Sequence, residues 1–328
     1  MVRETIILTR QEIATQVDLV AAIPAIEQAM GEFEKGQDYL PPKAIYQVPV
    51  GEAIAACITG YTQGTELLSM KLGQERTANP SRGLPTTNSW IAAFDPATGE
   101  LLMICDGTLP TMYRTAAAAA VSTKRLAREE ASTLAVIGAG QLGRQCVRAV
   151  RSTRDFKQVL LYDLSEEAAR QLAEDLAAPD EAPIDVADAA TVCSQADVLV
   201  TATNSRQAIV QSEWVKPGTH LCCMGSDLHQ KIECQPALLP RCRMYADFIE
   251  HALARGEVSQ GIEQGILDKD CYVGTLGQVI NCTVLGRTDP QQITLYDGVG
   301  IGIQDTTIAR SVLDQAIAKG IGTRVAFS

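Results

Sequence analysis

Histidine is scarce in this 328-residue chain, and its cysteines show none of the spacings that hold metal ions. Only three histidines are present, and the ten cysteines include no Cys-x-x-Cys pair. Zinc and most transition-metal sites need clusters of such ligands at short, regular spacing. No metal site is therefore expected, and the cysteines are better explained as reduced thiols that pack as small apolar residues.

Positive charge and long apolar runs are also in short supply. Lysine and arginine number 28 against 39 acidic residues, and the net charge of −11 disfavours binding to nucleic acid or to an anionic membrane. Near the start, the apolar run Ile6 to Leu8 is too short for a signal peptide or a membrane span. With 46% hydrophobic and 20% charged residues, we expect a globular, cytoplasmic protein of about two domains.

The first 110 residues mix helical and extended patterns. Residues 18–36 carry apolar residues at helical spacing, with Gly36 as the predicted stop. Extended runs follow at residues 44–50, 53–62, 67–73 and 88–107, and the last contains turn signals at Asp95-Pro96 and Thr98-Gly99. This pattern predicts an α+β unit rich in antiparallel strands.

From about residue 115 the chain alternates between strands and helices. The predicted strands are residues 133–140, 158–164, 196–203, 219–225 and 242–248. Such alternation implies right-handed crossovers and a parallel, doubly wound sheet. A final helix is expected over 305–320, with Asp305 as its N-cap and Gly320 as its stop, and it is expected to pack back on the first domain.

The stretch LAVIGAGQLGRQCVRAV, residues 134–150, has the pattern of a dinucleotide-binding turn. Gly138, Gly140 and Gly143 lie between an apolar strand and a helical pattern, and Asp163 ends the next strand. Glycines admit a pyrophosphate and the acid binds the ribose hydroxyl, although a plain tight turn with a solvated aspartate is the alternative. Because a carboxylate repels a 2′-phosphate and the adjacent Leu164 is no arginine, NAD is favoured over NADP.

Three further polar residues stand where chemistry could occur. Asp227 follows the strand 219–225, with Lys231 four residues later, at the sheet edge where ligands bind in parallel sheets. Lys71 lies in an extended run that could point it to either face, and Arg114 precedes an alanine run. From position alone, a turn residue, a solvated lysine and a surface charge explain these residues at least as well.

Seven motifs in order resemble the ornithine cyclodeaminase/μ-crystallin family. They are SMKLG, NPSRGLPT, FDPATGELL, YRTAAAAAVSTKRLA, VIGAGQLG, MGSDLHQKIE and YDGVGIGIQD, and they cover nearly the whole chain. The resemblance implies a discontinuous substrate-binding and dimerisation domain, residues 1–115 plus 305–328. An NAD-binding Rossmann domain, residues 116–304, would be inserted between them, and a homodimer is implied.

The resemblance also implies roles for single residues. Lys71 matches the family's catalytic lysine, Asp227 its catalytic acid, and Arg114 the arginine that holds the substrate carboxylate. Lys43 is a second predicted substrate-binding residue. The predicted cofactor-binding residues are Thr86, Arg114, Thr115, Gly138, Gly140, Gln141, Leu142, Gly143, Asp163, Thr203, Lys231 and Gly298.

Departures from the family pattern separate its branches. Ile58 stands where cyclodeaminases resemble one another in an acid that holds a distal amine, and Gly298 stands where they carry serine. Lys43 replaces an arginine of many members, and Leu142 replaces a glutamine, so phosphate contacts there would come from the backbone. These differences resemble the dehydrogenase and reductase branch.

We therefore expect an NAD-dependent oxidoreductase that interconverts a small α-amino acid with its imino or keto acid. Lys71 or Asp227 would pass a proton to the imine, and NAD would carry the hydride. A lyase that uses NAD without net redox chemistry is the alternative, and a non-catalytic ligand-binding protein is a third interpretation.

Overall fold

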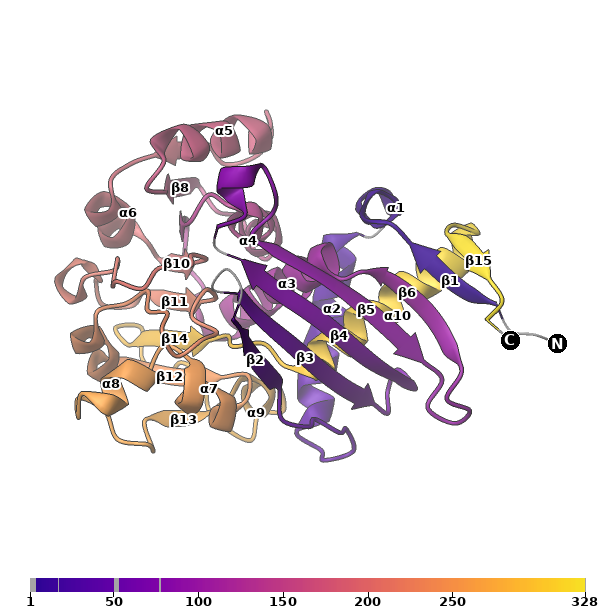
Figure 1. The fold of residues 1–328 in the computed structure, drawn as a ribbon. Coiled ribbons are helices and arrows are strands. Elements are labelled where there is room, and N and C mark those ends of the chain that lie inside the picture. The colour runs from indigo at the N-terminus through magenta and orange to yellow at the C-terminus, as the bar shows by residue number, and fades with distance from the viewer. Residues whose placement is uncertain (1–3, 17, 50–52, 77, 328) are drawn as a thin grey trace. The chain divides into compact units, whose positions relative to one another are not determined.

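The chain divides into two compact units in a computed structural model, which describes residues 4–16, 18–49, 53–76 and 78–327 (Figure 1). Unit 1 comprises residues 1–114 and 301–328, and unit 2 comprises residues 115–300. The first boundary falls inside helix α3 (Thr108–Leu126), and the second lies just before helix α10 (Gly302–Lys319).

Unit 1 is built on one seven-stranded sheet with the order β15-β1-β6-β5-β4-β3-β2. Its neighbouring strands run antiparallel, except for the parallel pair β1 and β6. All four extended runs predicted from the sequence form strands here. The strands are β1 (Thr5–Leu8), β2 (Ala44–Val48), β3 (Ala53–Thr62), β4 (Leu67–Arg76), β5 (Thr87–Phe94), β6 (Leu101–Asp106) and β15 (Thr323–Val325).

The helices of unit 1 include α1 (Arg10–Gln16), α2 (Leu19–Phe33) and a 3-10 turn at Pro80–Arg82. Helix α2 begins where the sequence predicted, because the Asp18 side chain accepts a hydrogen bond from the Val20 backbone N–H. The helix ends at Phe33, three residues before Gly36, which adopts φ +74° in the following turn.

Alternation along β4 decides which way Lys71 points. Leu67, Ser69 and Lys71 are buried on one face of the sheet, whereas Met70 and Leu72 are exposed on the other. The buried face packs against α10, which also contacts α2. Lys71 is therefore an inward-facing lysine, and only 4% of it is exposed.

Helix α10 sits close to the sheet because two glycines meet. A Cβ on Gly302 would lie 2.0 Å from the Thr59 carbonyl oxygen, and one on Gly60 would lie 2.6 Å from the Gly302 carbonyl. The expectation that Asp305 caps this helix is wrong, because the helix begins at Gly302 with Ile301 as N-cap. Asp305 lies inside the first turn and is buried. Gly320 ends the helix in the left-handed conformation, as predicted.

Unit 2 contains an eight-stranded, wholly parallel sheet with the order β13-β12-β14-β11-β10-β7-β8-β9. The run from β9 to β14 has the order of a Rossmann sheet, so the predicted α/β, doubly wound fold is confirmed. The strands are β7 (Thr133–Ile137), β8 (Gln158–Tyr162), β9 (Ile184–Val186), β10 (Val198–Thr201), β11 (His220–Cys223), β12 (Cys242–Ala246), β13 (Tyr272–Thr275) and β14 (Ile293–Asp297).

Helices connect these strands. They are α4 (Gln141–Arg151), α5 (Glu166–Leu176), α6 (Ala189–Gln195), α7 (Ile249–Arg255), α8 (Ser259–Glu263) and α9 (Leu276–Ile280), with 3-10 turns at Ser212–Trp214 and Pro236–Arg241. Among the residues that the structure describes, no helix is long and apolar enough to cross a membrane.

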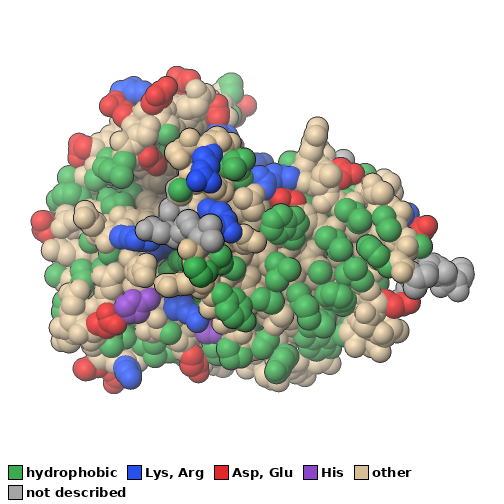
Figure 2. All heavy atoms as spheres, in the orientation of Figure 1, with side chains coloured by type: hydrophobic (Ala, Val, Ile, Leu, Met, Phe, Trp, Pro, Cys, Tyr) green, Lys and Arg blue, Asp and Glu red, His purple; other side chains and the backbone are tan. Residues whose placement is uncertain are grey.

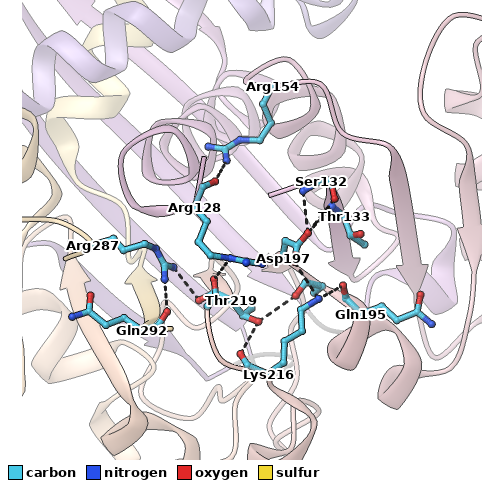
Figure 3. A network of polar contacts seen from close by, with 12 residues as sticks. Arg128, Ser132, Thr133, Arg154, Gln195, Asp197, Lys216, Thr219, Arg287 and Gln292 are labelled. Carbon is cyan, nitrogen blue, oxygen red and sulfur yellow. Dashed lines mark hydrogen bonds and ion pairs between the residues drawn. The ribbon is translucent and has the colours of Figure 1, made fainter. Parts of the chain in front are cut away.

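A polar network closes the amino ends of the strands in unit 2 (Figure 3). The Asp197 carboxylate accepts from the backbone N–H groups of Ser132 and Thr133 and from Arg128 Nη2 at 2.7 Å, and Lys216 Nζ lies 3.1 Å from it. Arg287 donates nearby to the Thr219 carbonyl and the Thr294 hydroxyl. This edge is opposite to the one that carries the glycine loop, so its cations hold the sheet together.

Candidate active site

The candidate residues fall into two groups, one in each unit. In unit 1, Lys71 and Arg114 form a buried ion cluster with Asp305. Lys71 Nζ lies 2.8 Å from both carboxylate oxygens of Asp305, and Arg114 Nε lies 3.0 Å from Asp305 Oδ1. All three side chains are at most 9% exposed. Strand β4, helix α3 and helix α10 each supply one member, so segments far apart in sequence build this cluster.

Burial changes the protonation chemistry of this cluster. Burial lowers the pKa of Lys71 to about 8, and the positive charge of Arg114 adds to this effect, whereas Asp305 opposes it. Burial alone would raise the pKa of Asp305, but the charges of Lys71 and Arg114 outweigh it and hold that pKa below its usual range. Asp305 is therefore ionised at neutral pH, and Lys71 can gain or lose a proton there.

The Arg114 guanidinium has more N–H donors than its two hydrogen bonds use. Its Nε donates to Asp305 and its Nη1 donates to Gln304 Oε1 at 3.1 Å. These two bonds leave part of the five-donor fork for another acceptor. A guanidinium fixed along one edge can bind a carboxylate through its remaining N–H groups.

Lys43 and Thr86 lie outside this ion cluster. Lys43, in the segment before β2, is partly buried, and its charge lowers the pKa of both Lys71 and Asp305. Its ammonium is thus close enough to act on the cluster. Thr86 precedes β5 and is partly buried, and its carbonyl accepts from the Arg76 N–H at 2.8 Å.

Both cross-strand neighbours of Lys71 are isoleucines. Ile58 of β3 and Ile91 of β5 lie directly opposite Lys71 in the antiparallel ladders. Residues in direct opposition project to the same face of a sheet. The lysine is therefore flanked by apolar side chains within the sheet, and its ionic partners come from the helices.

The glycine loop of unit 2 has the geometry that a dinucleotide needs. Gly138 adopts φ +107°, and a Cβ there would lie 2.6 Å from the Ala202 carbonyl oxygen. A Cβ on Gly143 would lie 1.8 Å from the Gly138 carbonyl oxygen, so α4 packs tightly on the loop. At Gly140 a Cβ would meet nothing within 4 Å. The loop is thus open where a pyrophosphate would approach and closed where helix and strand pack.

Further predicted cofactor residues lie at the same edge of the sheet. Gln141 and Leu142 form the first turn of α4, where backbone N–H groups favour an anion. Asp163, after β8, accepts hydrogen bonds from the Ala139 N–H at 2.7 Å and the Ser165 N–H at 2.9 Å. Its carboxylate thus contacts the glycine loop directly, while the neighbouring Leu164 is 88% exposed.

Asp227 follows β11 and pairs with Lys231. Lys231 Nζ lies 3.0 Å from Asp227 Oδ1 and donates to Asn204 Oδ1 at 3.0 Å. The Asp227 side chain is 50% exposed, whereas that of Lys231 is 8% exposed. Lys231 therefore links the segments that follow β10 and β11, and it holds the Asp227 carboxylate at the carboxyl edge of the sheet.

Glu233 also connects the segments at the ends of β10 and β11. This buried carboxylate accepts from the Thr201 hydroxyl at 2.6 Å, the Gly225 N–H at 2.9 Å, and both the N–H and hydroxyl of Thr203. The Thr203 hydroxyl is thus already engaged within the protein. Burial raises the pKa of Glu233, while these four hydrogen bonds favour its charged form.

Two remaining predicted residues are closely packed. Gly298 follows β14, its N–H donates to the Cys223 carbonyl, and a Cβ there would lie 2.6 Å from Met224 Cε. Thr115 follows Arg114 in α3 and is 6% exposed. Across the described ranges, no group of three or more His, Cys, Asp or Glu side chains is arranged to hold a metal ion.

Sequence reasoning missed Asp305 and Glu233. The sequence pattern predicts Asp305 as a helix cap, and Glu233 stands between Ile232 and Cys234, two residues that give no sign of its partners. Ile308 and Val312 stand three and seven residues after Asp305, and this helical spacing, which puts Asp305 on the apolar face of the helix, is a signal that could have indicated its burial.

The sequence as a whole matches the ornithine cyclodeaminase/mu-crystallin family over residues 3–320. The chain belongs to this family. It is 32% identical to the alanine dehydrogenase of Archaeoglobus fulgidus, over 99% of both chains. It is also 32% identical to the iminosuccinate reductase of Paracoccus denitrificans, over 98% of this chain and 99% of that one.

Solved structures of family members share the fold. An archaeal alanine dehydrogenase dimer with bound NAD matches with a TM-score of 0.93 and 30% identity, over 99% of this chain and all of that one. The Δ1-pyrroline-2-carboxylate reductase of Thermococcus litoralis, in complex with NADH and L-proline, matches with a TM-score of 0.95 and 27% identity, over 98% of this chain and all of that one.

Proposed function

We propose that this family member is an NAD-dependent oxidoreductase that interconverts a small α-amino acid with its imino or keto acid. The observation that carries the proposal is the buried cluster of Lys71, Arg114 and Asp305, in which two cations face one carboxylate. Such a cluster is suited to an anionic substrate that must also exchange a proton. Relatives that act on amino and imino acids support the same class of substrate.

The substrate carboxylate binds to unit 1 in this proposal. Arg114 offers the N–H groups that Asp305 and Gln304 leave, and Lys43 adds a second positive charge. The substrate carbon chain then lies against the apolar surroundings of Lys71, which include Ile58. Unit 1 is the substrate-binding domain on this interpretation.

Unit 2 is the cofactor-binding domain. Gly138, Gly140, Gly143 and the first turn of α4 would hold the pyrophosphate, and Asp163 would accept from the adenosine ribose hydroxyls. Thr86, Thr115, Thr203, Lys231 and Gly298 complete the proposed set. When bound, NAD supplies or accepts the hydride at the substrate α-carbon.

The proton comes from the chain's own residues. An imine becomes a far better hydride acceptor when its nitrogen is protonated. Lys71, with its pKa lowered by burial to about 8, can give up a proton near neutral pH and take it back. Asp227 is the second proposed proton-transfer residue, and the ammonium of Lys231 holds its carboxylate. The overall reduction consumes an imino acid, NADH and one proton, and yields an amino acid and NAD.

A panel of α-keto acids with ammonia, together with cyclic imino acids, tests the proposal. Each is incubated with NADH and with NADPH, and oxidation of the cofactor is followed by its absorbance. We expect NADH oxidation with at least one small substrate and a weaker response to NADPH. If the protein binds NADH but no member of the panel oxidises it, and a diamino acid releases ammonia without net cofactor oxidation, the enzyme is a lyase instead.

The assembly proposed for this enzyme is a homodimer in the cytoplasm. The outer face of the unit 1 sheet presents exposed apolar side chains from β2, β4 and β5, namely Tyr46, Met70, Leu72 and Trp90. Figure 2 shows hydrophobic side chains gathered over β3 to β6. A contiguous apolar face of this kind is typical of a surface that another subunit covers. Ten free cysteines suit a reducing compartment.

A further inference from the structure

Among the residues that the structure describes, Asp305 is the one anion paired with both Lys71 and Arg114, the two buried cations of unit 1. It lies in the first turn of α10, where an acidic side chain is favoured by the helix dipole. Its two oxygens are both 2.8 Å from Lys71 Nζ, and Oδ1 also accepts from Arg114 Nε. One carboxylate therefore fixes the positions of both cationic groups.

The turn that carries Asp305 is itself locked to the sheet. The Thr306 hydroxyl lies 2.7 Å from the Ser69 hydroxyl and 2.9 Å from the Gly60 carbonyl oxygen. Ser69 stands two residues before Lys71 on the same face of β4. The pairs Thr306–Ser69 and Asp305–Lys71 are thus consecutive links between α10 and β4. Close contact of Gly302 with Thr59 leaves the helix little room to shift.

The three charged side chains of this cluster do not balance one another. Lys71 and Arg114 carry two positive charges, and Asp305 carries one negative charge. Removal of Asp305 would leave two buried cations facing each other, and a buried ammonium then loses its proton readily.

We propose that Asp305 is a positioning residue for the proposed reaction: it holds the Lys71 ammonium and the Arg114 guanidinium in one arrangement, and it keeps the proton on Lys71 available for the substrate nitrogen. This inference rests on the proposed oxidoreductase function. The net positive charge that remains attracts the substrate carboxylate.

The expected pH dependence follows from the groups that face Lys71. These are Asp305 from α10, Arg114 from α3, and Lys43 from the segment before β2. Asp305 raises the pKa of Lys71 and the other two lower it, so removal of the carboxylate moves the pKa below its value of about 8. Because reduction needs protonated Lys71, activity is lost as pH rises through that pKa. In Asp305→Asn this loss shifts to lower pH by about one unit or more.

The test compares Asp305→Asn, Asp305→Glu and Thr307→Val. Thr307 is buried on the same helix, and its hydroxyl bonds to the Ile303 carbonyl, so Thr307→Val is the matched control. The pH profile of kcat/KM for reduction is measured for each variant. We expect the alkaline limb to move only in Asp305→Asn, while Asp305→Glu keeps the limb in place but lowers kcat because its longer arm displaces the ammonium.

A second readout separates this inference from the proposed function. The Cε resonance of Lys71 in 13C-lysine-labelled protein, assigned by its loss in Lys71→Met, is titrated with no substrate present. We expect a lower pKa in Asp305→Asn than in the wild type, whether or not the enzyme reduces any imine. An unchanged Lys71 pKa, or an unmoved alkaline limb, overturns the role of Asp305. If Asp305→Asn does not fold, the Asp305→Glu variant provides the test. This variant keeps the negative charge, so a shift of about one pH unit in the alkaline limb of its kcat/KM profile would also overturn the positioning role of Asp305.

Discussion

Ile58 and Lys71 lie directly opposite each other in the β3–β4 ladder, on the face of the sheet that α10 covers. The resemblance to the family predicts that Ile58 stands where cyclodeaminases have an acidic residue. The ladder places this position beside the proposed catalytic lysine, so its side chain can bear directly on which substrates fit. An isoleucine there offers no partner to a distal amine.

Replacement of Ile58 by Glu should change substrate preference. A carboxylate beside Lys71 would pair with a cationic group on the substrate and would leave an apolar side chain without a good contact. We expect kcat/KM for small apolar substrates to fall by at least about tenfold, and diamino substrates to become better competitors. Steady-state kinetics with both classes measure this, and Ile58→Val is the control. Equal losses for both classes would contradict the assignment.

Replacement of Arg114 by Lys should weaken substrate binding more than turnover. Lysine keeps the charge but loses the planar fork that bonds Asp305, Gln304 and the substrate carboxylate together. We expect KM to rise by about tenfold to a hundredfold, from the loss of one charge-assisted hydrogen bond. Fluorescence titration with NADH measures separately the second role predicted for Arg114, in cofactor binding. A normal KM for the substrate would rule out the carboxylate-binding role.

Features that depend on local sequence patterns could be predicted, whereas features that depend on contacts between distant segments could not. The glycine loop and the strands of unit 2 rest on local patterns, so they were predictable. The inward direction of Lys71 was not, because strand alternation allows two faces and only packing against α10 selects one.

The ion cluster of Lys71, Arg114 and Asp305 is a clearer example of what the sequence could not predict. Asp305 contacts Lys71 across 234 residues of chain, and no local rule connects them. The local rule for helix caps instead placed Asp305 at the start of a helix that in fact begins three residues earlier. Glu233 is a similar case, because its four hydrogen bonds come from the ends of two neighbouring strands. Such partners are brought together by the tertiary fold.

The double variant Asp163→Ser/Leu164→Arg should shift cofactor preference toward NADPH. It removes the carboxylate that repels a 2′-phosphate and adds a cation at an exposed position that packs against little. NADH affinity should fall by about tenfold or more, from the lost charge-assisted hydrogen bond and the lost contact of Asp163 with the Ala139 N–H. Fluorescence titrations with both cofactors measure the ratio. Leu164→Ala is the control, and an unchanged ratio in the double variant would argue against Asp163 as the ribose ligand.

Asp197→Asn should destabilise the protein in a pH-dependent way. Burial alone would raise the pKa of Asp197, but its bonds from the Ser132 N–H and from Lys216 are among those that outweigh burial and hold the pKa below its usual range. A lowered folded-state pKa contributes stability above the unfolded value of about 3.9, and that stability is lost as pH falls through the folded value.

We expect Asp197→Asn to cost about 1–3 kcal/mol at pH 7, and the difference from wild type to shrink in acid. Urea unfolding at pH 7 and below pH 4 measures both. Asp155→Asn changes an exposed carboxylate and should cost little at either pH. A cost that is constant with pH would show that the charge of Asp197 is not what stabilises the amino edge of the sheet.

Charged substitutions on the outer face of the unit 1 sheet should separate the proposed dimer. Leu72 and Trp90 lie opposite each other in the β4–β5 ladder and are 55% and 49% exposed. Burial of like charges between two copies of this face is strongly unfavourable, so Leu72→Glu/Trp90→Glu should run as a monomer in size-exclusion chromatography with light scattering, where the wild type runs as a dimer. Leu164→Glu adds a charge at an exposed apolar position of unit 2 and should leave the dimer intact. If the double variant remains dimeric, subunits associate through another surface, and this sheet face has a different partner.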